Sequence, residues 1–321
     1  MLVTAQAERW PIAGAFTIAR GSKTEAHVVV AEITEDGAVG RGEAVPYGRY
    51  GETVEGVLAQ IAGLPPRFDR AALQTLLPPG AARNAVDCAL WDLEAKQTSR
   101  PVWDLAGLPE PGPVTTCYTL SLASPQAMAV AAAAQAHRPL LKLKIGGPDD
   151  LACVEAVRGA APASGLVVDA NEGLAFEDLR RLAPEFARLG VRLIEQPLPA
   201  GEDAALEGYD CPVLLCADES LRSRAELEAV AGRYGAVNIK LDKAGGLTEA
   251  LALSAEARAR GLEIMVGCMV ATSLAMAPAM LLAQDAAIVD LDGALLLARD
   301  RAPGLFAEGS VLHPPLTALW G

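Results

Sequence analysis

The stretch that decides the fold runs from residue 140 to 245 and repeats one pattern, an apolar strand that ends in a charged side chain. The copies are LLKLKIG (140–146), LVVDANEG (166–173), VRLIEQPLP (191–199), VLLCADES (213–220) and AVNIKLDKAG (236–245). Their charged residues Lys144, Asp169, Glu195, Asp218 and Lys240 follow at intervals of 25, 26, 23 and 22 residues. Each interval fits one strand, one helix and two short loops, the unit of a parallel barrel. Since strand carboxyl ends meet at one mouth of a barrel, two lysines and three carboxylates are predicted to share a pocket.

Three further segments bring the number of strand-like runs to eight, the number that a closed barrel of this class requires. They are VTTCYTL (114–120), EIMVGCMV (263–270) and AIVDLDGALL (287–296). We therefore expect an α/β fold with a modified TIM-type (β/α) barrel over residues 113–298. Residues 299–321 contain three prolines, and we expect an irregular tail that packs back on the first domain.

The first third of the chain has a different pattern. HVVVAEITEDGAVGRGEA (27–44) predicts an antiparallel hairpin with its turn at Asp36-Gly37. Helical spacing of apolar residues follows, and LPEPGP (108–113) cannot continue a helix. An α+β capping domain over residues 1–112 is expected to precede the barrel. Its predicted helices cover residues 51–63, 69–77 and 80–97.

Composition limits the classes of partner. The chain of 321 residues has 40 acidic and 27 basic residues, a net charge of −13, which disfavours a nucleic-acid partner. The six cysteines form no CxxC pair and MLVTAQAERW (1–10) lacks the layout of a signal peptide, so we expect reduced thiols and a cytoplasmic protein. Residues 264–284 carry no charge but fit a strand followed by a helix, so we expect no membrane span. The oligomeric state stays open, a homo-oligomer included.

The carboxylates Asp169, Glu195 and Asp218 are the strongest chemical signal. They follow three consecutive strands, and no histidine or cysteine nearby favours zinc. An acidic residue after a strand often caps the next helix, which is the alternative for any one of them. Three in consecutive units at the catalytic face of a barrel favour a site for Mg²⁺ or Mn²⁺.

Lys142 and Lys144 flank one residue, so both side chains point to the same side of their strand. A barrel has no free edge where such a pair could be solvated. Two neighbouring cations disfavour each other's protonation, and we expect this to lower a lysine pKa toward the range of a general base. Lys240 lies four strands further on, across the mouth. A metal between opposed lysines would suit removal of a proton from one face of a carbon and its return to the other.

These residues resemble the enolase superfamily in its muconate-lactonizing subgroup, over essentially the whole chain. The matching motifs are KxK at 142–144, DAN at 169–171, EQP at 195–197, DES at 218–220 and NIKLDKAGG at 238–246. Enolase-superfamily sites pair a lysine or histidine base with one or two Mg²⁺ ions.

The resemblance implies a shared first step, abstraction of a proton alpha to a carboxylate whose oxygens bind Mg²⁺. Asp169, Glu195 and Asp218 would hold the metal, and Lys144 and Lys240 would be the opposed acid and base. Lys142 would help to neutralise the enediolate.

Substrate specificity is expected from other positions. Asp290 and Asp292 end the eighth strand as a pair that the metal does not need, and this DxD resembles that of dipeptide epimerases, where aspartates receive the free amino group. The alternative is that they meet lysines or helix N–H groups. Arg20 is the candidate for the acidic side chain of an Ala–Glu dipeptide, Lys23 could serve instead, and the loop with Tyr47, Arg49 and Tyr50 is expected to act as a lid.

The resemblance thus implies a dipeptide epimerase of the L-Ala-D/L-Glu type, with murein peptide recycling as the implied process. The alternatives within enzymes are an N-acylamino acid racemase, an o-succinylbenzoate synthase or a cycloisomerase of the same subgroup. Outside enzymes, the alternative is a metal-dependent binding protein without turnover.

Overall fold

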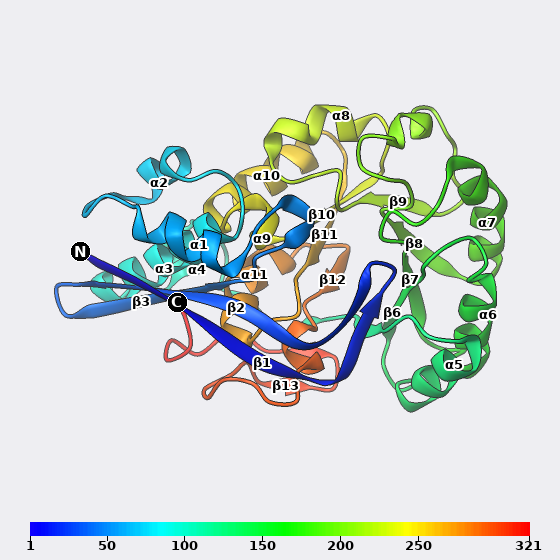
Figure 1. The fold of residues 1–321 in the computed structure, drawn as a ribbon, viewed down its shortest axis with the longest axis horizontal. Helices are drawn as coiled ribbons and strands as arrows, with labels where there is room; N and C mark the ends of the chain where they lie inside the picture. Colours follow the sequence, from blue (N-terminus) through cyan, green and yellow to red (C-terminus); the bar gives the residue numbers. More distant parts are fainter.

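The computed structural model describes residues 1–321 and places a cap beside a barrel (Figure 1). The cap contains an antiparallel sheet in the order β1-β2-β3. The predicted hairpin at 27–44 is confirmed, with Asp36 and Gly37 at φ values of 50° and 81° in its turn. The first strand was not predicted, because a proline interrupts its alternation, and the register shifts after Pro11. The strands are β1 (Leu2–Ile18), β2 (Gly21–Glu35) and β3 (Ala38–Ala44).

The three predicted cap helices are present within a few residues of their expected ends. The longest crosses β3 so closely that a side chain on Gly42 would place its Cβ 2.1 Å from the carbonyl oxygen of Ala85. This close approach explains a glycine within the strand. The helices are α1 (Val54–Ala62), α2 (Arg70–Leu76), α3 (Ala81–Thr98) and the short α4 (Val102–Leu105).

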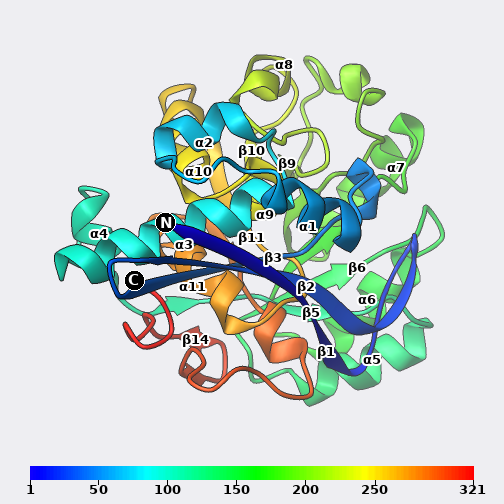
Figure 2. The same cartoon turned by 60° about the vertical axis from the view of Figure 1, so that its left-hand side comes forward.

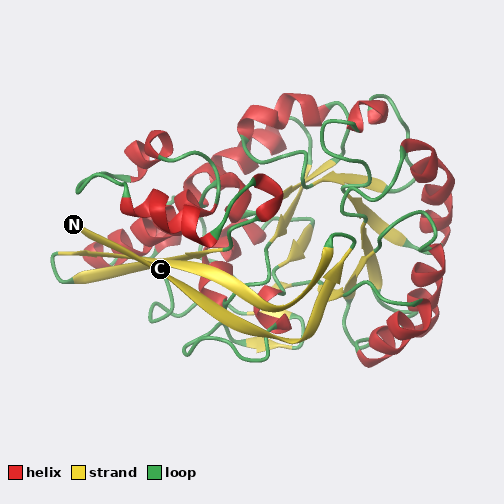
Figure 3. Cartoon of the chain, in the orientation of Figure 1, coloured by secondary structure: helices red, strands yellow, loops and turns green.

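Eight parallel strands form the predicted barrel, in sequence order around the sheet. Helices surround these strands (Figure 3). The first and last strands meet where Cys117 N donates to Val289 O at 2.8 Å and Leu291 N donates to the Thr116 hydroxyl at 2.8 Å. The strands are β5 (Tyr118–Leu120), β6 (Leu140–Lys144), β7 (Gly165–Asp169), β8 (Val191–Glu195), β9 (Leu214–Ala217), β10 (Ala236–Ile239), β11 (Glu263–Gly267) and β12 (Ile288–Asp290).

Helices cover the outside of the barrel, with one exception to the predicted unit. Between β8 and β9 the chain forms only the 3₁₀ turn η2 (Asp203–Leu206), since Gly201 and Gly208 adopt left-handed conformations on either side of it. The other connections are α5 (Pro125–Ala134), α6 (Leu151–Ala160), α7 (Phe176–Arg188), η3 (Arg224–Glu226) with α8 (Leu227–Ala231), α9 (Leu241–Ala244) with α10 (Leu247–Ala259), and α11 (Ser273–Ala283).

The uncharged segment 264–284 forms the end of β11 and the helix α11, as predicted. No helix of the structure has both the length and the apolar character that crossing a membrane requires.

The predicted strand 114–120 is divided in the structure. Its first half, β4 (Val114–Thr115), leaves the barrel and pairs with β14 (Val311–Leu312), which pairs with β13 (Ala307–Glu308). The tail therefore contains two short strands where an irregular segment was expected. It also reaches the cap, because Trp320 Nε1 donates to Cys88 O at 3.0 Å. The division of the chain after residues 112 and 298 stays a prediction.

The barrel interior is layered. An apolar layer takes one residue from each strand or its start: Cys117, Leu140, Val167, Leu193, Cys216, Ala236, Met265 and Ile288. Because side chains alternate along a strand, the residues two and four positions later face the same interior, nearer the carboxyl ends. Those positions carry the predicted lysines and carboxylates, so the charged layer rests on an apolar floor.

The cap contacts the barrel close to Lys240. The buried Asp242 accepts from Val45 N at 2.8 Å and from Asn84 Nδ2 at 3.1 Å, and burial raises the pKa of Asp242 to about 7. Arg83 of α3 donates to the carbonyl oxygen of Ala244 at 2.6 Å. The turn that follows Lys240 is therefore held by two elements of the cap.

Candidate active site

The charged layer places all the predicted lysines and carboxylates together at the barrel mouth. Lys144 is paired in register with Asp169, and Asp169 with Glu195, so the ends of β6, β7 and β8 lie side by side. Asp218 follows β9 directly and Lys240 follows β10. These side chains are buried, with exposures of 0% for Asp169 and Glu195 and 6% for both lysines.

Lys142 is the most buried of the three predicted lysines and contacts three carboxylates. Its ammonium nitrogen is 2.6 Å from Glu195 Oε2, 2.6 Å from Asp290 Oδ2 and 3.2 Å from Asp169 Oδ2. Buried ions need such partners, because removing them from water is costly. Lys142 thus neutralises part of the negative charge on three different strands.

Lys144 and Lys240 lie on strands four positions apart in the eight-stranded barrel, hence on opposite sides of the mouth. Lys144 Nζ is 2.5 Å from Asp169 Oδ2, and Lys240 Nζ is 2.8 Å from Asp218 Oδ2. Both lysines line one cavity of about 760 Å³. A small molecule in that cavity has an amine on each side.

The expected lowering of a lysine pKa by its neighbouring lysine is wrong for Lys142. Burial alone would lower the pKa of Lys142, but Asp290, Glu195 and Asp169 outweigh it and raise that pKa well above its usual value. Lys240 follows the same pattern, with Asp218 and Glu195 as its partners. The strand sequence shows only the neighbouring lysine. In the structure, carboxylates from other strands lie next to Lys142 and Lys240 and determine the direction of both pKa shifts.

The carboxylates fit the oxygen-donor set of a divalent cation. Burial, together with the charge of Asp169, raises the pKa of Glu195 to about 8. Glu195 Oε2 and Asp218 Oδ1 are buried and accept no aligned hydrogen bond. In this structure the three carboxylates do not converge as a ligand group, and lysine ammonium groups contact their oxygens instead. Three buried carboxylates, all oxygen donors, suit Mg²⁺.

Several residues that orient these carboxylates were not predicted as site residues. Asn238 Nδ2 donates to Glu195 Oε1 at 2.7 Å, and Gly267 leaves room for it, since a Cβ there would lie 2.6 Å from the Asn238 side chain. Gln196 Oε1 accepts from Asp218 N at 2.8 Å. Both residues lie within the motifs quoted above. A polar residue inside an apolar strand, as at Asn238, was the available signal.

Asp290 and Asp292 are both buried and line the cavity. Asp290 Oδ2 contacts Lys142, as the alternative reading expected, but its Oδ1 has no hydrogen-bond partner. Asp292 Oδ2 accepts from Thr119 N at 2.6 Å. Burial and the charge of Asp290 raise the pKa of Asp292 to about 7. The single positive charge of Lys142 is therefore shared among several carboxylates and cannot neutralise all of them.

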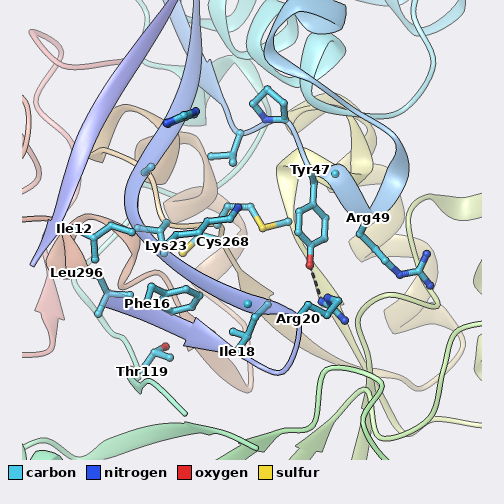
Figure 4. Close-up of a pocket in the computed structure, with 18 of the residues that line it drawn as sticks. Ile12, Phe16, Ile18, Arg20, Lys23, Tyr47, Arg49, Thr119, Cys268 and Leu296 are labelled. Atoms are coloured by element: carbon cyan, nitrogen blue, oxygen red, sulfur yellow. Dashed lines mark hydrogen bonds between the residues drawn. The ribbon is translucent and has the colours of Figure 1, made fainter. Parts of the chain in front are cut away.

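The tip of the β1–β2 hairpin reaches the barrel beside β6 (Figure 1, Figure 2). Leu122 N, beyond the end of β5, donates to Thr17 O at 3.0 Å. Arg20 lies in the two-residue turn of this hairpin, and its guanidinium contacts Glu219 Oε1 at 2.7 Å. It also donates to the Tyr47 hydroxyl at 2.7 Å (Figure 4). Arg20 also contacts Glu172, at 3.1 Å. The turn is thus fastened to the barrel next to the candidate metal ligands.

The second cap loop completes the wall. Tyr47 lines the cavity, and Arg49 donates to both carboxylate oxygens of Glu172, at 2.9 and 2.8 Å. Tyr50 does not line this cavity and packs edge-on against Tyr47, at 5.4 Å between ring centroids. Two arginines of the cap therefore converge on one barrel carboxylate.

Lys23 differs from Arg20 in having no ion pair or hydrogen bond to its ammonium group. It is exposed, lines the cavity, and is the cross-strand partner of Phe16, whose ring centroid is 5.8 Å from Lys144 Nζ (Figure 4). A free cation therefore faces the cavity on the side of Lys144.

A parallel barrel with opposed lysines and buried carboxylates at its mouth, completed by loops of a separate cap, defines a class of two-domain barrel enzymes. Comparison with known families agrees with this description. Residues 1–107 match the mandelate racemase / muconate lactonizing enzyme N-terminal domain, and residues 126–302 match the enolase C-terminal domain-like family. The chain belongs to the mandelate racemase / muconate lactonizing enzyme family of the enolase superfamily, which confirms the resemblance seen in its motifs.

Its relatives are epimerases and racemases. The chain is 47% identical over 312 residues to the L-Ala-D/L-Glu epimerase of Escherichia coli (strain K12), which covers 95% of this chain and 97% of that protein. It is 44% identical over 301 residues to an N-acetyl-D-glutamate racemase of Pseudoalteromonas sp., covering 92% of this chain and 95% of that protein.

Solved structures share the fold over the whole length. An enolase family member from Agrobacterium tumefaciens with homology to dipeptide epimerases, with bound sodium and L-Ala-L-Glu, has a TM-score of 0.95 and 52% identity over 99% of both chains. A dipeptide epimerase from Enterococcus faecalis, complexed with Mg and L-Leu-L-Tyr, has a TM-score of 0.88 and 28% identity, covering 98% of this chain and 96% of that chain. Homologous structures thus bind metal ions and dipeptides.

Replacing Glu195 with Gln tests the carboxylate site. Loss of one of three charged donors should weaken Mg²⁺ binding by at least about ten-fold and abolish turnover. The fold should persist, because glutamine keeps the shape of the side chain and can still accept the hydrogen bond from Asn238. Calorimetric Mg²⁺ titration and circular dichroism measure the two effects, with the exposed Asp104→Asn as control. Full activity in excess EDTA would refute the metal assignment.

Proposed function

We propose that the protein is a dipeptide epimerase of the L-Ala-D/L-Glu type, which moves a proton at the α-carbon of the C-terminal residue. The observation that carries the proposal is the entry of Lys144 and Lys240 into one cavity from opposite sides of the barrel. Binding alone has no use for two opposed amines, which argues against a protein without turnover.

The lysines divide the chemistry between the two faces of the α-carbon. One lysine, as the neutral amine, removes the α-proton, and the other, as the ammonium, delivers a proton to the opposite face. Lys142 would help to neutralise the negative charge that develops on the substrate carboxylate. Mg²⁺, or Mn²⁺, held by Asp169, Glu195 and Asp218, would supply further electrostatic stabilisation of that charge.

Asp290 and Asp292 would receive the free amino group of the dipeptide. The buried oxygen Asp290 Oδ1 has no hydrogen-bond partner, and burial together with the charge of Asp290 raises the pKa of Asp292. A substrate ammonium group would supply both a donor and a charge. This supports a substrate with a free amine over an acylated one.

Lys23 is a better candidate than Arg20 for the carboxylate of a glutamate side chain. Arg20 is already paired with Glu219 and Glu172, whereas Lys23 has no partner and faces the cavity beside Phe16 and Lys144. We therefore assign side-chain recognition to Lys23 and the fastening of the β1–β2 turn to Arg20.

An N-acylamino acid racemase is the second candidate. The ion pair of Asp290 with Lys142 favours this candidate. Asp290 already has a cationic partner in the protein and does not need one from the substrate. The similarity to an N-acetyl-D-glutamate racemase points the same way. Substrate comparison, described below, separates the two candidates.

The location and process are proposals as well. All six cysteines are free, which supports a reducing compartment and hence a cytoplasmic enzyme. Recycling of peptidoglycan peptides is the process that an L-Ala-D/L-Glu epimerase would serve.

The two-base assignment is tested with Lys144→Ala and Lys240→Ala. Each variant should lose epimerisation, because one proton path is missing, and each should exchange the α-proton of at most one isomer. Proton NMR in D₂O with L-Ala-L-Glu and L-Ala-D-Glu measures both reactions. Lys96→Ala, on α3 and paired with Asp92, serves as control and should behave as wild type. Near-native epimerisation by either active-site variant would contradict the mechanism.

The amine assignment is tested with Asp292→Asn. Loss of a charge-assisted contact of about 1.5–3 kcal/mol should lower kcat/KM for dipeptides by at least about ten-fold, but affect N-acetylglutamate little. Steady-state kinetics with both substrates give the comparison. If wild type prefers N-acetylglutamate and the variant changes both substrates alike, the racemase takes the place of the dipeptide epimerase.

Side-chain recognition is tested by comparing L-Ala-L-Glu with the uncharged L-Ala-L-Gln. Lys23→Met should lower kcat/KM for the glutamate dipeptide by roughly five-fold, the size of an exposed ion pair, and leave the glutamine dipeptide nearly unchanged. Arg20→Met is the matched variant and should lower both alike, since it loosens the turn. The reverse pattern would reassign recognition to Arg20.

A further inference from the structure

Lys243 is a buried lysine that the proposed proton transfer does not use. It lies in α9, three residues after Lys240, and is 2% exposed. Its ammonium nitrogen is 2.6 Å from Asp218 Oδ1, 2.5 Å from the backbone oxygen of Asp218 and 2.9 Å from that of Asn238. The two backbone oxygens accept hydrogen bonds from the ammonium group, and Asp218 Oδ1 is its ion-pair partner.

The contacts join two strand ends that carry site residues. Asp218 follows β9, and Asn238, which donates to Glu195, lies in β10. The carboxylate of Asp218 is held on both oxygens, since Oδ1 contacts Lys243 and Oδ2 contacts Lys240. Asp218 therefore keeps a counter-ion on Oδ1 even when Lys240 serves the substrate.

We propose that Lys243 is a positioning residue, which fixes the carboxylate of Asp218 for metal binding and holds β9 and β10 in the spacing that the site needs. The inference rests on the proposed function, because it assumes that Asp218 is a metal ligand. Groups that orient metal ligands through hydrogen bonds commonly change metal affinity ten- to a hundred-fold when they are removed.

A role in stability alone would give a different result. A lysine that only satisfied two buried carbonyl groups would, when replaced, lower the melting temperature and leave the metal affinity of the folded protein unchanged. Metal affinity therefore separates positioning from packing.

The experiment compares wild type with Lys243→Met, which keeps an unbranched side chain one atom shorter and removes its charge and donors. Mg²⁺ is titrated calorimetrically into each full-length protein, and the melting temperature is measured without metal. We expect Mg²⁺ binding about ten-fold weaker or more in Lys243→Met. Lys96→Met, whose lysine pairs with Asp92 in the cap, is the matched control and should bind as wild type.

Lys243→Arg covers the case in which the methionine variant does not fold. It keeps the charge and several donors in a different shape, and its Mg²⁺ affinity should be weaker than that of wild type. Unchanged affinity in a folded Lys243 variant, with wild type binding Mg²⁺, overturns the inference alone. Wild type that binds no Mg²⁺ in the barrel overturns the proposed metal site and the inference with it.

Discussion

The structure depends on the pairing of buried charges at the barrel mouth. Most ammonium and carboxylate groups here are removed from water, and their burial is tolerable because an opposite charge lies within hydrogen-bond distance. Lys142 contacts Asp169, Glu195 and Asp290 from three strands at once. The pairs that make burial tolerable also hold the amines of Lys144 and Lys240 on fixed sides of the cavity, so stability and the proposed chemistry rest on the same contacts.

The use of lysine in this chain follows from that constraint. The sequence has only six lysines, and all but Lys96 line the cavity or contact its carboxylates. The remaining basic residues are arginines, which do not release a proton in proteins. The lysine ammonium is compact and sits on a flexible side chain. This suits proton transfer and also the contacts of Lys243 with three oxygen atoms. The chain thus reserves lysine for the site and uses arginine for its surface and for fastening the cap.

Much of the site could be predicted because two regularities act together. Alternation along β6 directs Lys142 and Lys144 inward, and the constant spacing places Asp169, Glu195 and Asp218 at neighbouring strand ends. What depends on contacts between distant segments could not be predicted. The pairing of β4 with the tail is one example. The direction of the Lys142 pKa shift is a second example. The sequence shows that Lys144 is close to Lys142, but it does not show that three carboxylates from other strands contact Lys142.

The short turn between β1 and β2 has a consequence for how the cavity can change. Ile18 pairs with Gly21 across a turn of two residues, and Phe16 pairs with Lys23 next to the cavity. Inserting or deleting one residue in this hairpin would move every side chain beyond that point to the opposite face of the sheet, since side chains alternate between the two faces of a strand. Arg20 would also leave its carboxylate partners. Substitutions that keep the length of this hairpin can therefore change the substrate specificity of the cavity. Lengthening of the loop can hardly do so.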